Sequence, residues 1–274
     1  MYFVHAYIVL QIIVFVTTEE NPLQYQPPEV SPALFEGDLE WDEGIDTKRR
    51  LGVIIQQKLW TNKTVPYLIS KKYNNREKKY IRKAINVINR MTCIELIPRM
   101  KNEVDYLYFK NSKKHSGCSS YVGRRGGKQN IYLQKRNSMG GNCFRRTGTI
   151  IHEIMHSLGV LHEQSRLDRD EYITIHFENI MPGAEKNFRK TVHSFATSKF
   201  QYDINSIMHY GGNYFSIDEK KPTITAKKAG SIKLGQRKGM SILDCLKLNH
   251  MYGCLQEPNE KKRYQSICNS FGIQ

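Results

Sequence analysis

Residues 152–166, HEIMHSLGVLHEQSR, place three histidines and two glutamates on one short stretch of chain. The segment 147–161 contains no proline, and its glycines lie close to its two ends, so the sequence predicts a helix there. His152 and His156 are four residues apart, and both imidazoles therefore project from the same face of that helix. Two histidine nitrogens on one helix face can bind a single metal ion.

The residues that follow extend this pattern toward a catalytic zinc site. Gly159 accepts the positive φ that ends a helix, after which the chain can bring His162 back as a third ligand. Three protein ligands leave a fourth position on zinc for water, which distinguishes a catalytic site from a structural one. Glu153 lies beside the first ligand and can take a proton from water whose pKa zinc has lowered. The alternative is a helix with incidental polar residues.

The longer pattern HExxHxxGxxH fixes five residues at four spacings, and a methionine turn follows it in metzincin proteases. Residues 206–210, SIMHY, match that turn. The run HEIMHSLGVLHEQSRLDRDEY resembles the astacin family of zinc metalloproteases, and the resemblance extends from about Phe35 to Cys254. Further matching positions are Trp60, VPY at 65–67, CSSYVG at 118–123 and GQR at 235–237.

The resemblance implies an α+β fold with two lobes and a cleft between them. A twisted mixed sheet and the zinc helix would form the upper lobe, and the lower lobe would be irregular and carry the C-terminal helix. Hydrophobic periodicity independently predicts a helix at 76–91 and a strand near Trp60. The core face of the first helix would consist of Tyr80, Ile81, Ala84, Ile85 and Ile88. Further strands are expected around 96–100, 106–110 and 129–134, and a helix at 241–252.

The family's catalytic roles carry over to matching residues of this chain. One zinc ion per subunit would be bound by His152, His156 and His162. Glu153 would act as the general base and later pass its proton to the leaving amine. Tyr210 matches a tyrosine that is a further zinc ligand and swings away to stabilise the tetrahedral intermediate, as a phenol donor can.

Other residues would support this site. Met208 would pack beneath the metal, and Glu163 resembles a glutamate that contacts the new N-terminus after activation. His209 adjoins Tyr210 in the turn, and we do not expect it to be a ligand. Lys227 resembles a residue of the pocket beyond the scissile bond, where a basic side chain favours acidic substrates. The alternative is that Lys227 and the next lysine form an exposed loop pair.

The N-terminal part predicts export and latency. Residues 3–16 are apolar but short for a membrane span, so 1–18 is expected to be a signal peptide, with an uncleaved anchor as the alternative. A proline-rich linker follows at 21–32. Phe35-Glu36-Gly37-Asp38 resembles the family's propeptide motif, in which Asp38 would occupy the zinc and act as the latency switch.

A cluster at 47–50, TKRR, is of the kind that processing proteases cut, although it could also be an exposed charged turn. The resemblance places the mature N-terminus at about Leu51. The expected organisation is therefore a propeptide at 19–50, a catalytic domain at 51–254 and a C-terminal tail at 255–274.

Six cysteines in an exported chain suggest three disulfides, and six cysteines allow 15 pairings. None forms a CxxC, which argues against structural zinc bound by cysteine. The resemblance implies the pairs Cys93–Cys254 and Cys118–Cys143, which leaves Cys245 and Cys268 to pin the tail. The sequon at Asn62 could carry a glycan.

The charge is unevenly distributed. The first 50 residues carry nine acidic and three basic side chains, whereas the rest carries 39 basic and 17 acidic ones. So basic a body could bind nucleic acid, could attract anionic proteins, glycans or cell surfaces, or could be a solvated surface with no single target. Nucleic-acid-binding motifs are missing from the sequence, so nucleic acid is not an expected partner.

The sequence thus predicts a secreted, monomeric zinc endopeptidase that is made as a latent precursor and does not insert stably into membranes. Its substrates would be proteins or peptides, with a preference for acidic residues after the scissile bond. A catalytically weak zinc protein that acts as a basic, toxin-like binding module is the alternative. Such a module would need neither Glu153 nor the latency segment.

Overall fold

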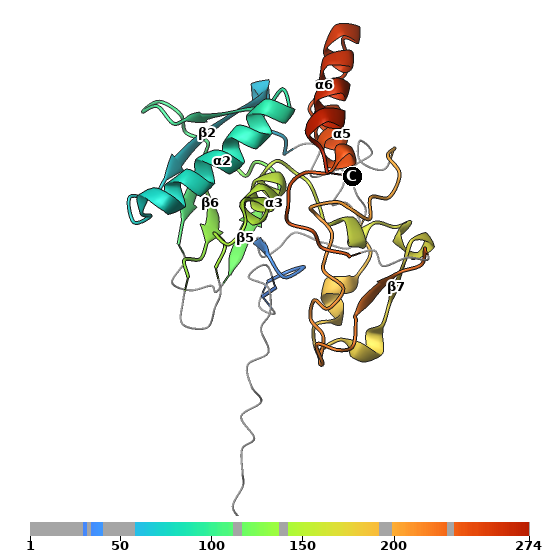
Figure 1. Ribbon diagram of the computed structural model, residues 1–274. Helices are drawn as coiled ribbons and strands as arrows, with labels where there is room; N and C mark the ends of the chain where they lie inside the picture. The colour runs from blue at the N-terminus through green and yellow to red at the C-terminus, as the bar shows by residue number, and fades with distance from the viewer. Residues whose placement is uncertain are drawn as a thin grey trace, which may run out of the picture.

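The computed structural model describes residues 30–31, 34–40, 58–111, 117–136, 142–191, 199–228 and 233–273. The expected signal peptide, the basic cluster at 47–50 and Leu51 lie outside these ranges, as does most of the linker. The described chain forms an α+β fold with a six-stranded sheet, a two-stranded sheet and four α-helices (Figure 1). In these ranges, no helix has both the length and the apolar character that crossing a membrane requires.

The larger sheet has the strand order β1-β5-β6-β4-β2-β3. The β5–β6 pair is antiparallel, and the other four pairs are parallel. Its strands are β1 (Leu39–Glu40), β2 (Thr64–Ile69), β3 (Glu95–Pro98), β4 (Tyr106–Lys110), β5 (Cys118–Tyr121) and β6 (Lys128–Leu133). The strands expected near 96–100, 106–110 and 129–134 are confirmed. The strand predicted near Trp60 begins only at Thr64, because a 3-10 turn, Thr61–Lys63, intervenes.

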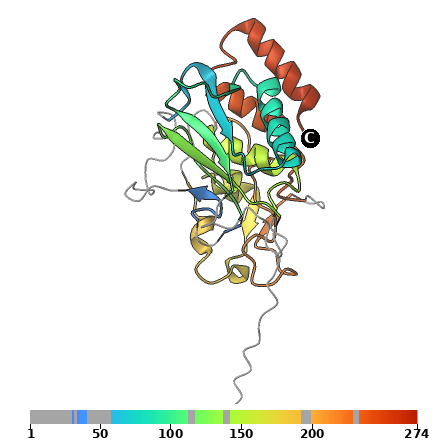
Figure 2. The same cartoon turned by 90° about the vertical axis from the view of Figure 1, so that its left-hand side faces the viewer.

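Helix α2 (Asn75–Met91) packs against α3 (Thr147–Ser157), and both lie on the same face of the sheet (Figure 2). A capping box starts α2, since the Asn74 side chain accepts from the Glu77 amide while the Glu77 carboxylate accepts from the Asn74 amide. The predicted core face is confirmed except for Tyr80, which is only partly buried. Its buried residues are Ile81, Ala84, Ile85, Ile88 and Met91.

The lower lobe has little regular structure, as expected. Its strands β7 (Ile173–Ile175) and β8 (Ile224–Ala226) form an antiparallel pair among short 3-10 turns. A hydrophobic cluster separate from the sheet core holds this lobe together, with Phe188, Tyr210 and Phe215 at its centre. Tyr210 and Phe188 meet edge to face with ring centroids 5.8 Å apart, a favourable aromatic geometry.

Two C-terminal helices, α5 (Ile242–Met251) and α6 (Pro258–Phe271), end the chain. The first matches the helix predicted at 241–252, and its buried side chains join the same core as α2 and α3. The second was not predicted, because the tail after Cys254 has only two fully buried side chains, Tyr264 and Cys268. The Cys245–Cys268 disulfide ties α6 to α5.

Candidate metal centre

Helix α3 carries the first two histidines and is almost wholly buried. Its first turn packs so tightly that a Cβ on Gly148 would lie 2.1 Å from the Arg237 carbonyl oxygen, so glycine is required there. The helix was predicted to reach residue 161 but ends at Ser157. Gly159, with a φ of 99°, reverses the chain just beyond this end and directs it back toward the sheet.

Hydrogen bonds at Nδ1 fix the orientation of both helix histidines. Nδ1 of His152 donates to the Ile207 carbonyl oxygen at 2.8 Å, and Nδ1 of His156 donates to the Val160 carbonyl oxygen at 2.8 Å. A carbonyl oxygen can only accept, so each neutral ring carries its proton on Nδ1 and keeps a lone pair on Nε2. Such backbone partners fix the tautomer in which a histidine binds metal.

The two Nε2 atoms of His152 and His156 face each other at 3.0 Å. Burial lowers the pKa of both histidines, which favours the neutral rings. Two lone pairs at this separation repel each other unless a cation lies between or beside them. The pair therefore fits a bound metal ion better than any arrangement of neutral rings alone.

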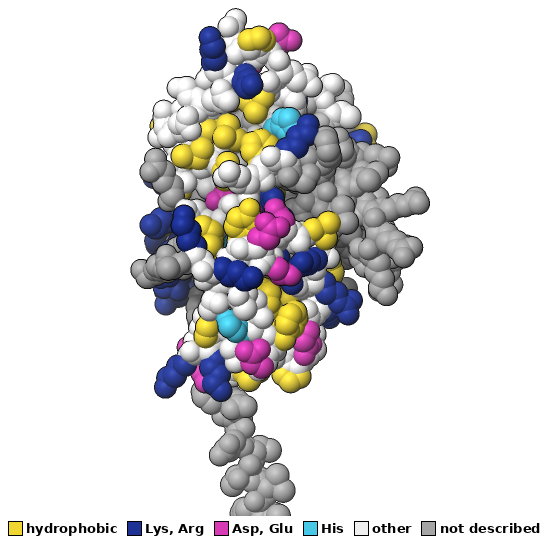
Figure 3. Space-filling view, turned by 90° about the vertical axis from the view of Figure 1, so that its right-hand side faces the viewer, with side chains coloured by type: hydrophobic (Ala, Val, Ile, Leu, Met, Phe, Trp, Pro, Cys, Tyr) yellow, Lys and Arg dark blue, Asp and Glu magenta, His cyan; other side chains and the backbone are white. Residues whose placement is uncertain are grey.

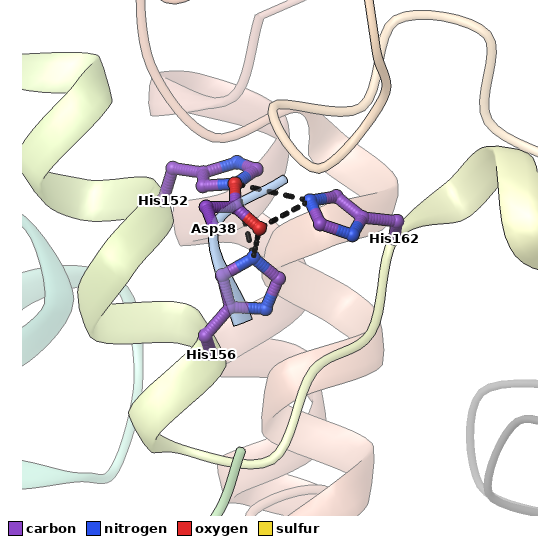
Figure 4. Close-up of side chains that lie close together, drawn as sticks. All are labelled: Asp38, His152, His156 and His162. Atoms are coloured by element: carbon purple, nitrogen blue, oxygen red, sulfur yellow. Dashed lines mark hydrogen bonds and ion pairs between the residues drawn. The ribbon is translucent and has the colours of Figure 1, made fainter. Parts of the chain in front are cut away.

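Asp38 and His162 complete the group (Figure 4). An Asp38 oxygen lies 3.0 Å from Nε2 of His152, and the other lies 3.2 Å from Nε2 of His162 and 3.6 Å from Nε2 of His156. The four residues are fully buried and offer ligand atoms within 4.8 Å of one another. Three imidazole nitrogens and one carboxylate oxygen are a donor set that suits zinc.

The electrostatics of the cluster favour an ionised carboxylate. Burial tends to raise the pKa of Asp38, but its contacts with the three imidazoles, above all with the charged His162, outweigh burial and hold that pKa well below its usual value. Burial tends to lower the pKa of His162, but the carboxylates of Asp38 and Glu36 raise it to about 9. Negative charge is thus concentrated beside the imidazole nitrogens, as a divalent cation requires.

A tight turn brings Asp38 to the histidines. Glu36 and Gly37 have positive φ values of 46° and 79°, and the Leu39 amide closes the turn on the Phe35 carbonyl oxygen at 3.0 Å. Beyond the turn, β1 pairs in parallel with β5 at the edge of the sheet. A non-glycine residue at positive φ costs about 1 kcal/mol, so contacts made by Glu36 must offset that strain.

Glu36 makes these contacts, and the sequence did not predict them. Its carboxylate lies 2.7 Å from Nδ1 of His162 and accepts from the Thr191 hydroxyl at 3.3 Å. Its backbone oxygen accepts from the Tyr210 hydroxyl at 2.5 Å. The available signal was its position two residues before Asp38, but only the turn shows that both carboxylates face the same histidine.

The methionine turn packs against this cluster. Met208 is fully buried, and its carbonyl oxygen accepts from the Glu163 amide at 3.1 Å. His209 points elsewhere, as expected, because its Nε2 accepts from the Tyr202 hydroxyl at 2.7 Å and its Nδ1 donates to the Tyr210 carbonyl oxygen. The turn thus supports the residues around the histidines without placing His209 among them.

Glu163 is fully buried and ion-paired within the described chain. Its carboxylate accepts from Lys247 Nζ at 2.6 Å, from the Arg166 guanidinium at 3.2 Å and from the Asp203 amide at 2.8 Å. Burial tends to raise its pKa, but Lys247 and Arg166 lower it. The partner implied by the resemblance, an N-terminus near Leu51, lies outside the described residues.

The remaining predicted residues fall in different surroundings. Glu153 is fully buried on α3 beside His152. Lys227 follows β8 with an exposed side chain, and Asn62 is exposed in the turn before β2. The structure contains the disulfides that the resemblance implied, together with the remaining pair; they are Cys93–Cys254, Cys118–Cys143 and Cys245–Cys268.

The family model that matches this chain is Astacin, described as a peptidase family, and the match covers residues 53–253. The chain is similar to the zinc metalloproteinases nas-15 and nas-4 of Caenorhabditis elegans, 39% identical over 200 and 197 residues, which are 72% and 71% of this chain. It is also 38% identical over 190 residues, 69% of its length, to High choriolytic enzyme 1 of Oryzias latipes. The aligned regions are 32%, 59% and 66% of these relatives, so the chain spans less than two thirds of each.

A solved structure gives the same result. High choriolytic enzyme 1, described as a hatching enzyme zinc-protease from Oryzias latipes, matches with a TM-score of 0.64 and 36% sequence identity. The match covers 73% of this chain and 96% of that chain. The two-lobed fold of this chain is therefore similar to that of a zinc protease of known structure.

Proposed function

The chain belongs to the astacin family of peptidases, and from this premise we propose that it is a secreted zinc-dependent endopeptidase made as a latent precursor. One observation carries the proposal: the Asp38 carboxylate lies among the Nε2 atoms of three buried histidines. A carboxylate from the N-terminal part of the chain would there compete with water for the metal. The substrates of the activated enzyme would be proteins or peptides, and the enzyme would act as a monomer.

In the proposed mechanism, His152, His156 and His162 bind the zinc ion. Zinc bound there supplies Lewis acidity, which lowers the pKa of water toward neutral. Glu153 takes the proton of the attacking water and then delivers it to the leaving amine. Glu153 follows His152 on a buried helix, so its carboxylate is kept away from bulk solvent.

Tyr210 would stabilise the negative charge that develops on the substrate carbonyl oxygen. Burial raises the pKa of its phenol well above the ordinary value, so the hydroxyl keeps its proton at neutral pH and remains a donor. In the described state this hydroxyl donates to a peptide carbonyl oxygen, that of Glu36, at 2.5 Å. A hydroxyl that donates to a peptide oxygen beside the histidines is suited to an oxyanion.

Latency would depend on the segment around Asp38. Three sets of contacts bind it, namely those of Asp38 with the histidines, those of Glu36 with His162 and Tyr210, and the pairing of β1 with β5. Activation would require cleavage after Arg50 and departure of residues 19–50, so that water and substrate can reach the ligand set. Residues 1–18 would direct export, and 51–254 would form the catalytic domain.

The test is peptide cleavage by the chain after processing at Arg50. The processed protein should cleave a peptide library, lose that activity on dialysis against a chelator and recover it when zinc is added. Addition of magnesium serves as the control, because the magnesium ion prefers oxygen ligands over imidazole. Activity that survives complete removal of the metal would refute the proposal.

We also propose that Lys227 makes the enzyme prefer substrates with an acidic residue after the scissile bond. Its side chain is exposed, and its backbone amide donates to the Tyr172 carbonyl oxygen at 2.8 Å, which holds the backbone just after β8. An exposed ammonium contributes roughly 0.5–1 kcal/mol to an ion pair, so Asp should be preferred over Ala by about 3-fold. Lys227→Ala should abolish that preference, and added salt should weaken it in the wild type.

The measurement compares kcat/KM for two peptides that differ only in the residue after the cut. Lys221→Ala is the matched control, since that lysine is also exposed in the lower lobe. An equal loss of preference in both variants would show that overall charge, and not Lys227, selects the substrate.

A further inference from the structure

The outer face of α2 carries a row of cations. Its members are exposed, and they are Arg76, Lys79, Arg82, Lys83 and Arg90. At 3.6 residues per turn, four of them fall within a sector of about 60° opposite the buried face, with Arg82 beside them. From the first to the last, at 1.5 Å per residue, this basic row is about 21 Å long.

The row is not neutralised within the described part of the chain. Glu77 is the one acidic residue of α2, but its side chain is mostly buried, accepts from the Asn74 amide and lies 3.4 Å from Lys135 Nζ. The guanidinium of Arg90 stacks on the Phe271 ring of α6 at 4.0 Å, which leaves its charge in place. No carboxylate among the described residues pairs with Arg76, Lys79, Arg82 or Lys83.

This arrangement of like charges lowers the stability of α2, and the fold does not need charged residues at these positions. Like charges three and four residues apart destabilise a helix, and α2 contains such pairs, for example between Lys79 and Lys83. The opposite face of α2 provides the packing, so uncharged residues would serve the fold equally well. On the face of the molecule shown in Figure 3, by contrast, Asp and Glu side chains lie among the Lys and Arg side chains.

We propose that the basic row of α2 is a docking surface for a linear sulfated polysaccharide. A straight row of unneutralised cations complements a chain of sulfate groups. Lys72, which is exposed just before α2, extends the positive surface beyond Arg76. The large exposed hydrophobic side chains lie outside α2, and among them Phe271 of α6 stacks with Arg90 at one end of the row. A helix that binds a membrane surface presents such side chains along its own length beside its cations, as α2 does not.

The row lies on the solvent face of α2, while α3, which carries His152 and His156, packs against another side of that helix (Figure 1). Polysaccharide bound along α2 would therefore leave the histidine cluster accessible. The surface would keep the enzyme concentrated on an anionic matrix without occupying its active site.

The test compares two variants of the full chain that lose the same charge. The first is R76Q/K79Q/R82Q/K83Q, and the second is the lower-lobe control K186Q/R189Q/K220Q/K221Q, whose four side chains are exposed. Glutamine is a good helix former, so circular dichroism and thermal unfolding should show that α2 is retained. Heparin, heparin stripped of its sulfates, and vesicles containing phosphatidylserine are the probes.

We expect the α2 variant to bind heparin about 10-fold more weakly at physiological salt, and the control variant less than about 2-fold more weakly. Wild-type binding should disappear with desulfated heparin, and after processing at Arg50 the peptidase activity of both variants should equal that of the wild type. If the two variants lost heparin affinity equally, net charge alone would explain the binding, and the proposal would be overturned. A loss of vesicle binding that leaves heparin binding intact would overturn it in favour of a membrane.

Discussion

Glu153→Gln should lower kcat/KM of the processed enzyme by about 10³-fold while the protein keeps its zinc. General acid–base catalysis contributes about 10² to 10⁴ in rate, and glutamine can neither accept nor deliver the proton. The ligand atoms belong to three histidines, and the Nδ1 bonds of His152 and His156 to backbone oxygens of the catalytic domain do not involve Glu153, so the metal should remain. Metal analysis and kinetics on the same preparation check both halves of this expectation.

The control for Glu153→Gln is Glu185→Gln, which makes the same chemical change at an exposed position of the lower lobe. It should leave activity and zinc content unchanged. If the Glu153 variant folds but has lost its zinc, then Glu153 is a ligand. If it retains full activity, another group serves as the base.

Asp38→Ala should give an unprocessed precursor that cleaves peptides at least about 10-fold faster than the wild-type precursor. Asp38 contacts the nitrogens of all three histidines, and because it belongs to the same chain its effective concentration at the cluster is high. Alanine removes that competitor for the metal but leaves the pairing of β1 with β5. The precursor should therefore become partly, not fully, active.

Glu40→Ala is the matched control for Asp38→Ala. Glu40 lies on the same segment, and its buried carboxylate accepts from the Ser119 hydroxyl at 2.7 Å outside the histidine cluster. The Glu40→Ala substitution should loosen the segment around Asp38 without exposing the ligand set. Equal activation by both variants would mean that general anchoring, and not the carboxylate among the histidines, maintains latency.

The parts of the site that the sequence predicted are those that depend on local geometry. Two histidines at i and i+4 share a helix face wherever the helix lies, and Gly159 allows the reversal that returns His162. The predicted helix was nevertheless four residues too long. The apolar pattern continues to residue 161, whereas the helix ends where the chain turns toward Asp38.

The parts that the sequence did not predict depend on contacts between distant segments. Glu36 reaches His162, 126 positions away, only because two consecutive residues adopt positive φ. The strand Cys118–Tyr121 reads CSSY, which lacks the alternation of apolar residues that marks a strand. Lys247 on α5 meets Glu163 across 84 positions, and no local pattern indicates that pair.

The most direct test of the account is a crystal structure of the unprocessed chain with anomalous diffraction recorded on both sides of the zinc absorption edge. The account predicts one strong zinc peak per subunit, bounded by Nε2 of His152, His156 and His162 and by the Asp38 carboxylate. A cluster that lacks this peak, or a peak whose neighbours exclude Asp38, would contradict it.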